Sequence, residues 1–189
     1  MSYSLNTIIL EPLSKEKPKS AVILCHGYGG DGKDISILAN YWRAYLPNTI
    51  FVCPDAPEIC AASSSGFQWF DLMDQTPEQI LSKSLVAESK LNKLIDEVKE
   101  KNSLLANKIV IGGFSQGCMI SLQTGIKRKD TINSIIGYSG RIIDTAHLGK
   151  NIFSKPNIIL MHGDIDQIVP VNSLLEAKDF FNKNNYKIE

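Results

Sequence analysis

The feature that most constrains the fold is an alternation of short, continuous apolar runs with longer segments of helical period. Runs such as Val22-Ile23-Leu24 and Ile109-Val110-Ile111 contain no polar alternation, which is typical of parallel strands covered on both faces. This alternation predicts repeated βα units, and so an α/β fold of three layers with a mainly parallel sheet. The predicted strands are Ala21 to Cys25, Ile50 to Cys53, Lys108 to Gly112, Ser134 to Ser139 and Asn157 to His162, with Ile8 to Leu10 as an extra edge strand.

Four segments between the predicted strands have the period of helices. The best marked begins at Thr76-Pro77-Glu78-Gln79, an N-cap, a first-turn proline and a capping-box glutamine, and runs to about Lys101. The loop from Pro54 to Asp74 is long for a compact domain, and loops of this length are often functional. The other predicted helices run from about Asp34 to Leu46, Ser115 to Lys127 and Asn172 to Asn184.

The bulk properties exclude several classes of protein. A chain of 189 residues is long enough for one sizeable core and predicts a single domain. The 20 basic and 20 acidic residues balance, which argues against a nucleic-acid partner. Four cysteines without metal-ligand spacing indicate reduced, buried thiols, with no metal ion or cofactor. No run is long enough for a membrane span and no export signal is present, so we expect a cytoplasmic protein.

The segment Gly113-Phe114-Ser115-Gln116-Gly117 lies directly between a predicted buried strand and a predicted helix. This is the structural context that a Gly-x-Ser-x-Gly nucleophile elbow requires. The tight turn strains the serine backbone, so residues two positions away on either side must lack bulk. The turn also places the hydroxyl at the positive end of a helix and aims the Gln116 N–H at a developing oxyanion. Ser115 is therefore the predicted nucleophile.

The glycine-rich segment from His26 to Gly30 follows the first predicted buried strand. In a fold with this elbow, that loop supplies the second oxyanion-hole N–H, which we assign to Tyr28. The glycines also allow a sharp turn, and the two interpretations are compatible. His26 is predicted to fix the loop through hydrogen bonds and not to act as a base.

Two aspartates compete for the role of triad acid in the segment His162 to Pro170, because chain order in this fold is Ser, Asp, His. At this point the sequence resembles the carboxylesterase, lysophospholipase and acyl-protein thioesterase family of α/β-hydrolases, over nearly the whole chain. The motifs that carry the resemblance are His26-Gly27-x-Gly29, Cys53-Pro54-Asp55-Ala56-Pro57, Trp69-Phe70-Asp71, Gly113-Phe114-Ser115-Gln116-Gly117 and His162-Gly163-Asp164-x-Asp166-x-x-Val169-Pro170.

The resemblance implies a serine hydrolase that acts on carboxylic esters or thioesters through an acyl-enzyme. It assigns the acid to Asp166 and makes Asp164 a structural partner of the turn. It also places Trp69 in a segment bordering the substrate groove, where substrate contact and packing under the loop remain alternatives. The implied partner is a small ester or thioester, with a lipid and an acylated protein both compatible. A homo-oligomer is also compatible, and no membrane integration is expected.

The same resemblance puts the triad histidine on the loop after the final strand. Only 23 residues (189 − 166) follow Asp166, so we expect one domain, 1–189, that lacks the final strand, loop and helix and leaves an apolar strip on the sheet uncovered. His162 is predicted to lie two strands from Ser115, at about 10 Å, too far for a hydrogen bond. His147 is predicted on the surface. The alternative function is a catalytically disabled, truncated relative that binds an acyl ligand at most.

Overall fold

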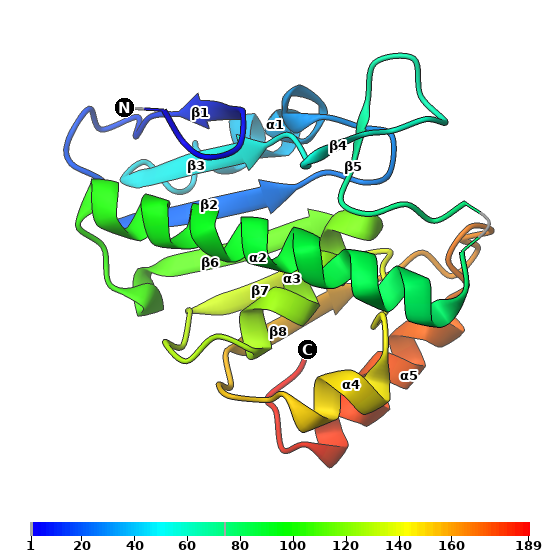
Figure 1. Cartoon of the computed structure of the whole chain (residues 1–189). Coiled ribbons are helices and arrows are strands. Elements are labelled where there is room, and N and C mark those ends of the chain that lie inside the picture. Colours follow the sequence, from blue (N-terminus) through cyan, green and yellow to red (C-terminus); the bar gives the residue numbers. More distant parts are fainter. Residues whose placement is uncertain (1, 74) are drawn as a thin grey trace.

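The computed structural model describes residues 2–73 and 75–189, and it has three layers, with helices on both faces of a central sheet (Figure 1). In chain order the elements are β1 (Thr7–Leu10), β2 (Ser20–Cys25), α1 (Gly32–Trp42), β3 (Thr49–Pro54), β4 (Glu58–Ile59), β5 (Phe67–Gln68), α2 (Pro77–Asn102), the 3-10 helix η1 (Ala106–Lys108), β6 (Ile109–Phe114), α3 (Gln116–Ile126), β7 (Ser134–Tyr138), α4 (Thr145–Lys150), β8 (Asn157–Met161) and α5 (Asn172–Lys183).

The main sheet has the strand order β1-β3-β2-β6-β7-β8. β1 runs antiparallel to β3, and every later neighbour pair is parallel. The carboxyl ends of β2, β6, β7 and β8 therefore meet at one edge of the sheet, which is where open α/β sheets bind ligands. β6, which leads into Ser115, lies between β2 and β7 near the middle of this edge.

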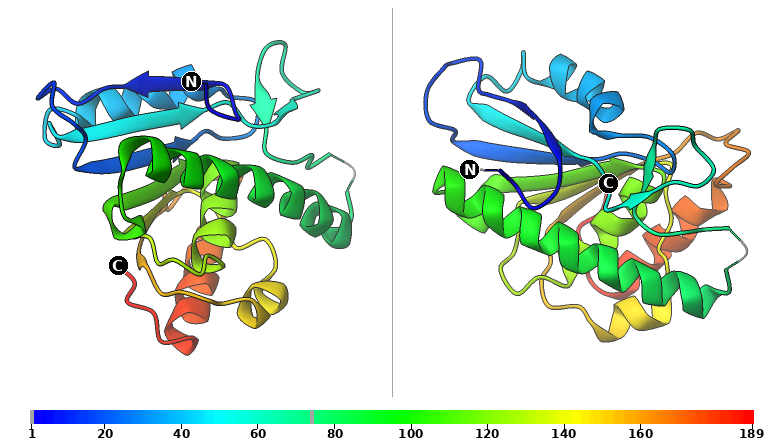
Figure 2. Two further views of the ribbon diagram at one scale, coloured as in Figure 1. Left: turned by 60° about the vertical axis from the view of Figure 1, so that its left-hand side comes forward. Right: turned by 45° about the horizontal axis from the view of Figure 1, so that its top comes forward.

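The two faces of the sheet are covered unequally. The larger apolar core lies between the sheet and α2, α3 and α5, and includes Leu91, Ile120 and Phe181. A smaller core lies under α1, around Phe51 and Leu24. Figure 2 shows α1 on one side of the sheet and α2 on the other. Continuous burial along β2 and β3 explains why these strands carry no polar residues facing solvent.

The predicted strands and long helices are confirmed, with ends that shift by a few residues. The capping box at Thr76 is complete, because Thr76 and Gln79 each accept a hydrogen bond from the other's backbone N–H. The sequence analysis missed three short features: α4, η1 and the β4–β5 hairpin inside the long loop that was expected to end at Asp74. Asp74 itself lies outside the described residues.

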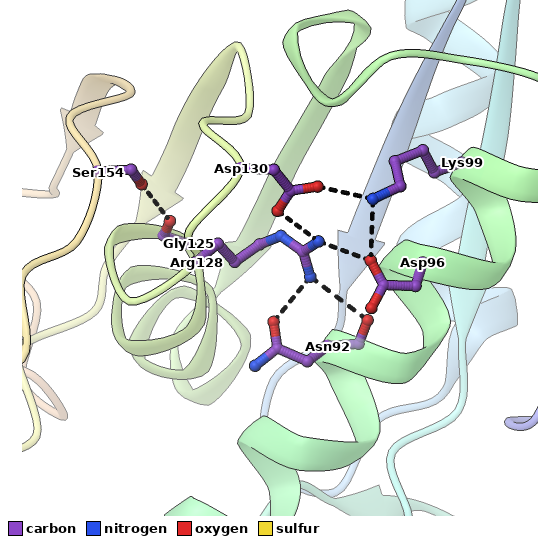
Figure 3. Close-up of polar contacts among 7 residues, drawn as sticks. All are labelled: Asn92, Asp96, Lys99, Gly125, Arg128, Asp130 and Ser154. Carbon is purple, nitrogen blue, oxygen red and sulfur yellow. Dashed lines mark hydrogen bonds and ion pairs between the residues drawn. The ribbon is translucent and has the colours of Figure 1, made fainter.

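A polar network ties the end of α3 to α2 (Figure 3). The Arg128 guanidinium lies 2.6 Å from an Asp96 carboxylate oxygen and 2.7 Å from one of Asp130, and it also donates to Asn92. Lys99 bridges the same two carboxylates. A planar guanidinium suits this divergent pairing. The network holds α3, which begins at Ser115, against the long helix.

On the α1 side, the sheet beyond β6 has no helix over it in the described part of the chain. Alternate residues of the last strands, among them Ile136 and Ile159, are only half-buried there, and Met161 is 40% exposed. An uncovered apolar strip on the sheet stays a prediction, and this is the face to which it applies. Residues 187–189 pair with β8 in the parallel direction, through a bridge between Ile158 and Ile188 and hydrogen bonds between 2.9 and 3.2 Å long.

Candidate active site

Ser115 lies at the turn between β6 and α3 with φ 53° and ψ −115°. A non-glycine residue in this region is strained, as the sequence predicted for the centre of the elbow (Gly113 to Gly117). The conformation is held on both sides. The Ser115 N–H donates to the Tyr138 carbonyl at 2.8 Å, and the Ser115 carbonyl accepts from Met119 inside α3.

The two glycines of the elbow have no room for a side chain. A Cβ on Gly113 would lie 2.3 Å from the Gly117 carbonyl carbon, and a Cβ on Gly117 would lie 2.1 Å from the Cys25 carbonyl oxygen. Both neighbours are backbone atoms, which cannot rotate away. The glycines are therefore required because the first turn of α3 packs directly on the elbow and on the end of β2.

The glycine loop (His26 to Gly30) is fixed from several sides. The buried His26 ring accepts a hydrogen bond from the Ala56 N–H at Nε2 (2.9 Å), so its proton is on Nδ1, which donates to the Gly27 carbonyl at 2.7 Å. Both ring nitrogens are thus engaged. Burial lowers the pKa of His26, although the nearby carboxylates oppose this shift, and the ring is held neutral. The predicted loop-fixing role matches this geometry.

The long loop packs on the glycine loop at Gly29, which has φ +78°. The Gly29 N–H donates to the Phe67 carbonyl at 2.9 Å, and the Phe67 N–H donates to the Gly30 carbonyl at 2.8 Å. A Cβ on Gly66 would lie 1.8 Å from the Gly29 carbonyl oxygen. The hairpin strand β5 thus fixes the backbone of the glycine loop through hydrogen bonds. This contact was not predicted from the sequence.

The Gln116 side chain joins α3 to the long loop. It is fully buried, accepts from the Trp69 N–H at 2.8 Å, and donates to the Phe70 carbonyl at 2.6 Å. Trp69 is also fully buried, and its indole N–H donates to the His26 carbonyl. The suggestion that Trp69 contacts substrate is therefore corrected: the structure gives it the packing role, because none of its surface is open.

Two backbone N–H groups next to Ser115 remain unused. Within the described residues, neither the Tyr28 nor the Gln116 N–H donates a hydrogen bond to the backbone. The glycine loop approaches the elbow closely, since a Cβ on Gly27 would lie 3.4 Å from the Ser115 Cβ. Free donors at the start of a helix and on a facing loop form the arrangement that stabilises an oxyanion.

The aspartate turn (His162 to Pro170) follows β8. One Asp166 oxygen accepts from the N–H groups of Ile168 and Val169, both at 2.9 Å. These two donors are the main cause that lowers the pKa of the Asp166 carboxyl, and Ser139 and His162 add to it. Asp164 is exposed and makes no side-chain hydrogen bond among the described residues. The expectation that Asp164 braces the turn is therefore wrong, because Asp166 itself does so.

The other two histidines are engaged away from Ser115. The buried His162 side chain places Nε2 2.7 Å from the Val169 carbonyl and 3.7 Å from an Asp166 oxygen, so it braces the aspartate turn as predicted. His147 lies on α4, half-buried, with Nε2 3.3 Å from the Lys127 ammonium. His147 is thus partly exposed, and its ring also contacts Lys127.

Two cavities flank Phe114, whose side chain is 50% exposed. The first, of about 430 Å³, is almost wholly apolar and is lined by residues such as Leu24, Leu38, Tyr138 and Met161. The second, of about 310 Å³, is lined by the glycine loop together with Asp34. Phe114 and Ile35 border both cavities. Neither Phe114 nor Asp34 was assigned a site role from the sequence, because both roles depend on how α1 packs beside the elbow.

Ser139 was also missed. It follows β7 with φ 47°, and its N–H donates to the Met161 carbonyl at 2.9 Å. Its hydroxyl is one of the groups that lower the pKa of Asp166. Ser139 therefore connects β7, the strand beside β6, to the aspartate turn. The available signal was its position: it is the last residue of a predicted parallel strand, at the carboxyl edge where such sheets bind ligands.

Comparison with known proteins agrees with this geometry. Residues 8–189 match the family model described as Phospholipase/Carboxylesterase. The chain belongs to this family. It is 30% identical to acyl-protein thioesterase 1 of Saccharomyces cerevisiae over 177 residues (86% of this chain and 77% of that protein). It is also 30% identical to acyl-protein thioesterase 1 of Schizosaccharomyces pombe over 199 residues (99% and 86%).

A crystal structure of esterase PE8 superposes on this chain with a TM-score of 0.93 at 33% identity. The match covers 98% of this chain and 86% of the esterase chain. The α/β-hydrolase fold is thereby shown, and the family is one of ester and thioester hydrolases. The alternative of a disabled relative receives no support from these matches. In the described residues no helix is long and apolar enough to cross a membrane.

Proposed function

We propose that the protein hydrolyses carboxylic esters or thioesters through an acyl-enzyme on Ser115. The observation that carries the proposal is the strained Ser115 backbone at a strand-to-helix turn, with two unused N–H groups beside it. Strain at a residue that is over-determined by its surroundings is typical of functional sites. The glycines on either side of it have no space for a side chain.

In the proposed first half-reaction, the Ser115 Oγ gives its proton to a base and bonds to the carbonyl carbon. The carbonyl π electrons move to oxygen, and the oxyanion accepts hydrogen bonds from the Tyr28 and Gln116 N–H groups. Each such donor contributes on the order of 3 kcal/mol to transition-state stabilisation. Collapse breaks the bond to the alcohol or thiol, which leaves with the proton. Water then repeats the sequence and releases the acid.

Asp166 is the proposed acid that orients and stabilises the protonated base. Its lowered pKa keeps the carboxylate ionised, which is the state that this role needs. His26, His147 and His162 are each held by other contacts.

The proposal extends to the cellular setting. The four cysteines are all buried and unpaired, and burial raises the pKa of Cys25, Cys53 and Cys118 to about 12. Such thiols are protonated and unreactive. This supports a protein that works in a reducing compartment, and we propose the cytoplasm.

The test is hydrolysis of a p-nitrophenyl ester and of an acyl thioester by the purified protein and by Ser115→Ala. The matched control is Ser82→Ala, the same change on the exposed face of α2. We expect turnover in the wild type and the control and its loss in Ser115→Ala. Equal turnover in all three would show that the hydrolysis does not use Ser115.

A further inference from the structure

We propose that Asp34 selects the leaving group, so that esters whose alcohol part carries a positive charge are hydrolysed in preference to neutral or anionic esters of the same shape. This inference rests on the proposed function and names its substrate class more closely. It concerns the second cavity, of about 310 Å³, between the glycine loop and the start of α1.

Among the described residues that line the second cavity, Asp34 is the only one with a carboxylate. Its carboxylate lies against the glycine loop, since an Oδ2 atom is 3.5 Å from the position of a Cβ on Gly30. The side chain is exposed and has no hydrogen bond or ion pair within the described residues. A substrate group that enters this cavity therefore meets a free negative charge.

The neighbouring carboxylates already accept hydrogen bonds from backbone N–H groups. Asp31 accepts from the Asp34 N–H at 2.8 Å as the N-cap of α1, and Asp55 accepts from the Gly32 N–H at 2.8 Å. Together with Asp34, these residues oppose the burial that lowers the pKa of His26, so their combined field reaches the glycine loop. Lys33 is the nearest cation along α1, but it does not line the cavity.

The shapes of the two cavities indicate which part of the substrate lies beside Asp34. The first cavity is almost wholly apolar and larger, so an acyl chain gains most by entering it. Phe114 and Ile35 separate it from the second cavity. With the acyl chain on one side of Phe114, the alcohol or thiol part projects on the other side, toward Asp34.

The expected effect is modest, because Asp34 is exposed. Unit charges roughly 6 Å apart in a medium like water change a rate constant about threefold. The effect falls as salt screens the pair. A preference of this size is measurable as a ratio between two substrates of the same shape, which cancels differences in enzyme concentration and folding.

The experiment compares kcat/KM for butyrylcholine and for 3,3-dimethylbutyl butyrate, which differ in charge and not in shape. We expect the wild type to favour the choline ester by about threefold, Asp34→Asn to show a ratio near one, and Asp34→Lys to reverse the preference. Asp179→Asn, an equal charge change on the exposed face of α5, is expected to keep the wild-type ratio. Thermal unfolding of each variant checks the fold.

A wild-type ratio of one, or a ratio that Asp34→Asn and Asp179→Asn change equally, would overturn the inference while the proposed function stands. An ester with the cation on its acyl part provides a further arm. If that ester alone depends on Asp34, the assignment to the leaving group is wrong. Failure of Ser115-dependent hydrolysis for every ester would instead overturn the proposed function, and this inference with it.

Discussion

Replacing Gly117 by alanine tests the packing that creates the site. The added Cβ would lie 2.1 Å from the Cys25 carbonyl oxygen and 2.6 Å from that of His26. Ordinary contact begins at 3.4 Å, so the first turn of α3 must move by 3.4 Å less 2.1 Å, or 1.3 Å. Because the obstructing atoms belong to β2 and the glycine loop, no side-chain rotation relieves the clash.

The expected loss of stability follows from two opposing contributions. Overpacking at a site that cannot relax costs about 3 kcal/mol. Alanine's higher helix propensity offsets about 1 kcal/mol of this. The net decrease in the free energy of unfolding is therefore about 2 kcal/mol, which corresponds to a fall in Tm of about 4–8 °C for a domain of this size.

Urea unfolding followed by circular dichroism measures this change directly. The matched control is Gly149→Ala on α4, where the new Cβ would meet only the Phe180 ring at 3.6 Å. We expect that variant to be as stable as the wild type or more stable by up to about 1 kcal/mol. If Gly117→Ala unfolded within about 0.5 kcal/mol of the wild type, the steric argument for the elbow would be refuted.

Three further changes test other parts of the structure. Gln116→Leu leaves both backbone partners at 69–70 buried and unsatisfied, so urea unfolding is expected to show a loss of about 2–4 kcal/mol. Lys127→Met leaves the buried Glu88 carboxylate without its 2.7 Å ammonium partner, and calorimetry is expected to show a loss of about 2–3 kcal/mol. The Asp166 carboxyl has a lowered pKa in the folded protein. Its contribution to stability is therefore present above its unfolded pKa of about 4 and is lost as pH falls toward the folded value. Asp166→Asn is expected to flatten this acid limb when the free energy of unfolding is measured against pH.

Each of these changes has a control or a contradicting result. A Gln116→Leu variant as stable as the wild type would show that the backbone groups at 69–70 do not depend on this side chain. Adding Glu88→Leu to Lys127→Met removes the unpaired charge, and it is expected to restore most of the loss. An acid limb unchanged in Asp166→Asn would show that the turn's hydrogen bonds do not depend on the charge of this carboxylate.

The elements that the sequence predicted well are those fixed by local pattern. Apolar runs without alternation identified the parallel strands, and the capping box at Thr76 identified the start of α2. The strained Ser115 backbone was predictable, because a strand-to-helix turn leaves no room for side chains two positions away on either side of the serine, and both positions are glycine. In each case a few adjacent residues were sufficient to predict the local structure.

The features that were missed or misassigned depend on contacts between distant segments. Trp69 is buried because Gln116 and His26, far away in the chain, take its two N–H groups. Asp166, and not Asp164, braces the turn because the chain folds back at Ile168 and Val169. Such choices are decided by the pairing of distant backbone groups, which no local pattern of residue types encodes.

Covalent labelling by a fluorophosphonate probe, read out by mass spectrometry of the tryptic peptide that spans residues 109–127, tests the central claim most directly. The account predicts a single adduct on Ser115, which is lost in Ser115→Ala. Ser121 in the same peptide is fully buried and serves as an internal control. An adduct on another serine, or labelling that persists in Ser115→Ala, would contradict the assignment of Ser115 as the nucleophile.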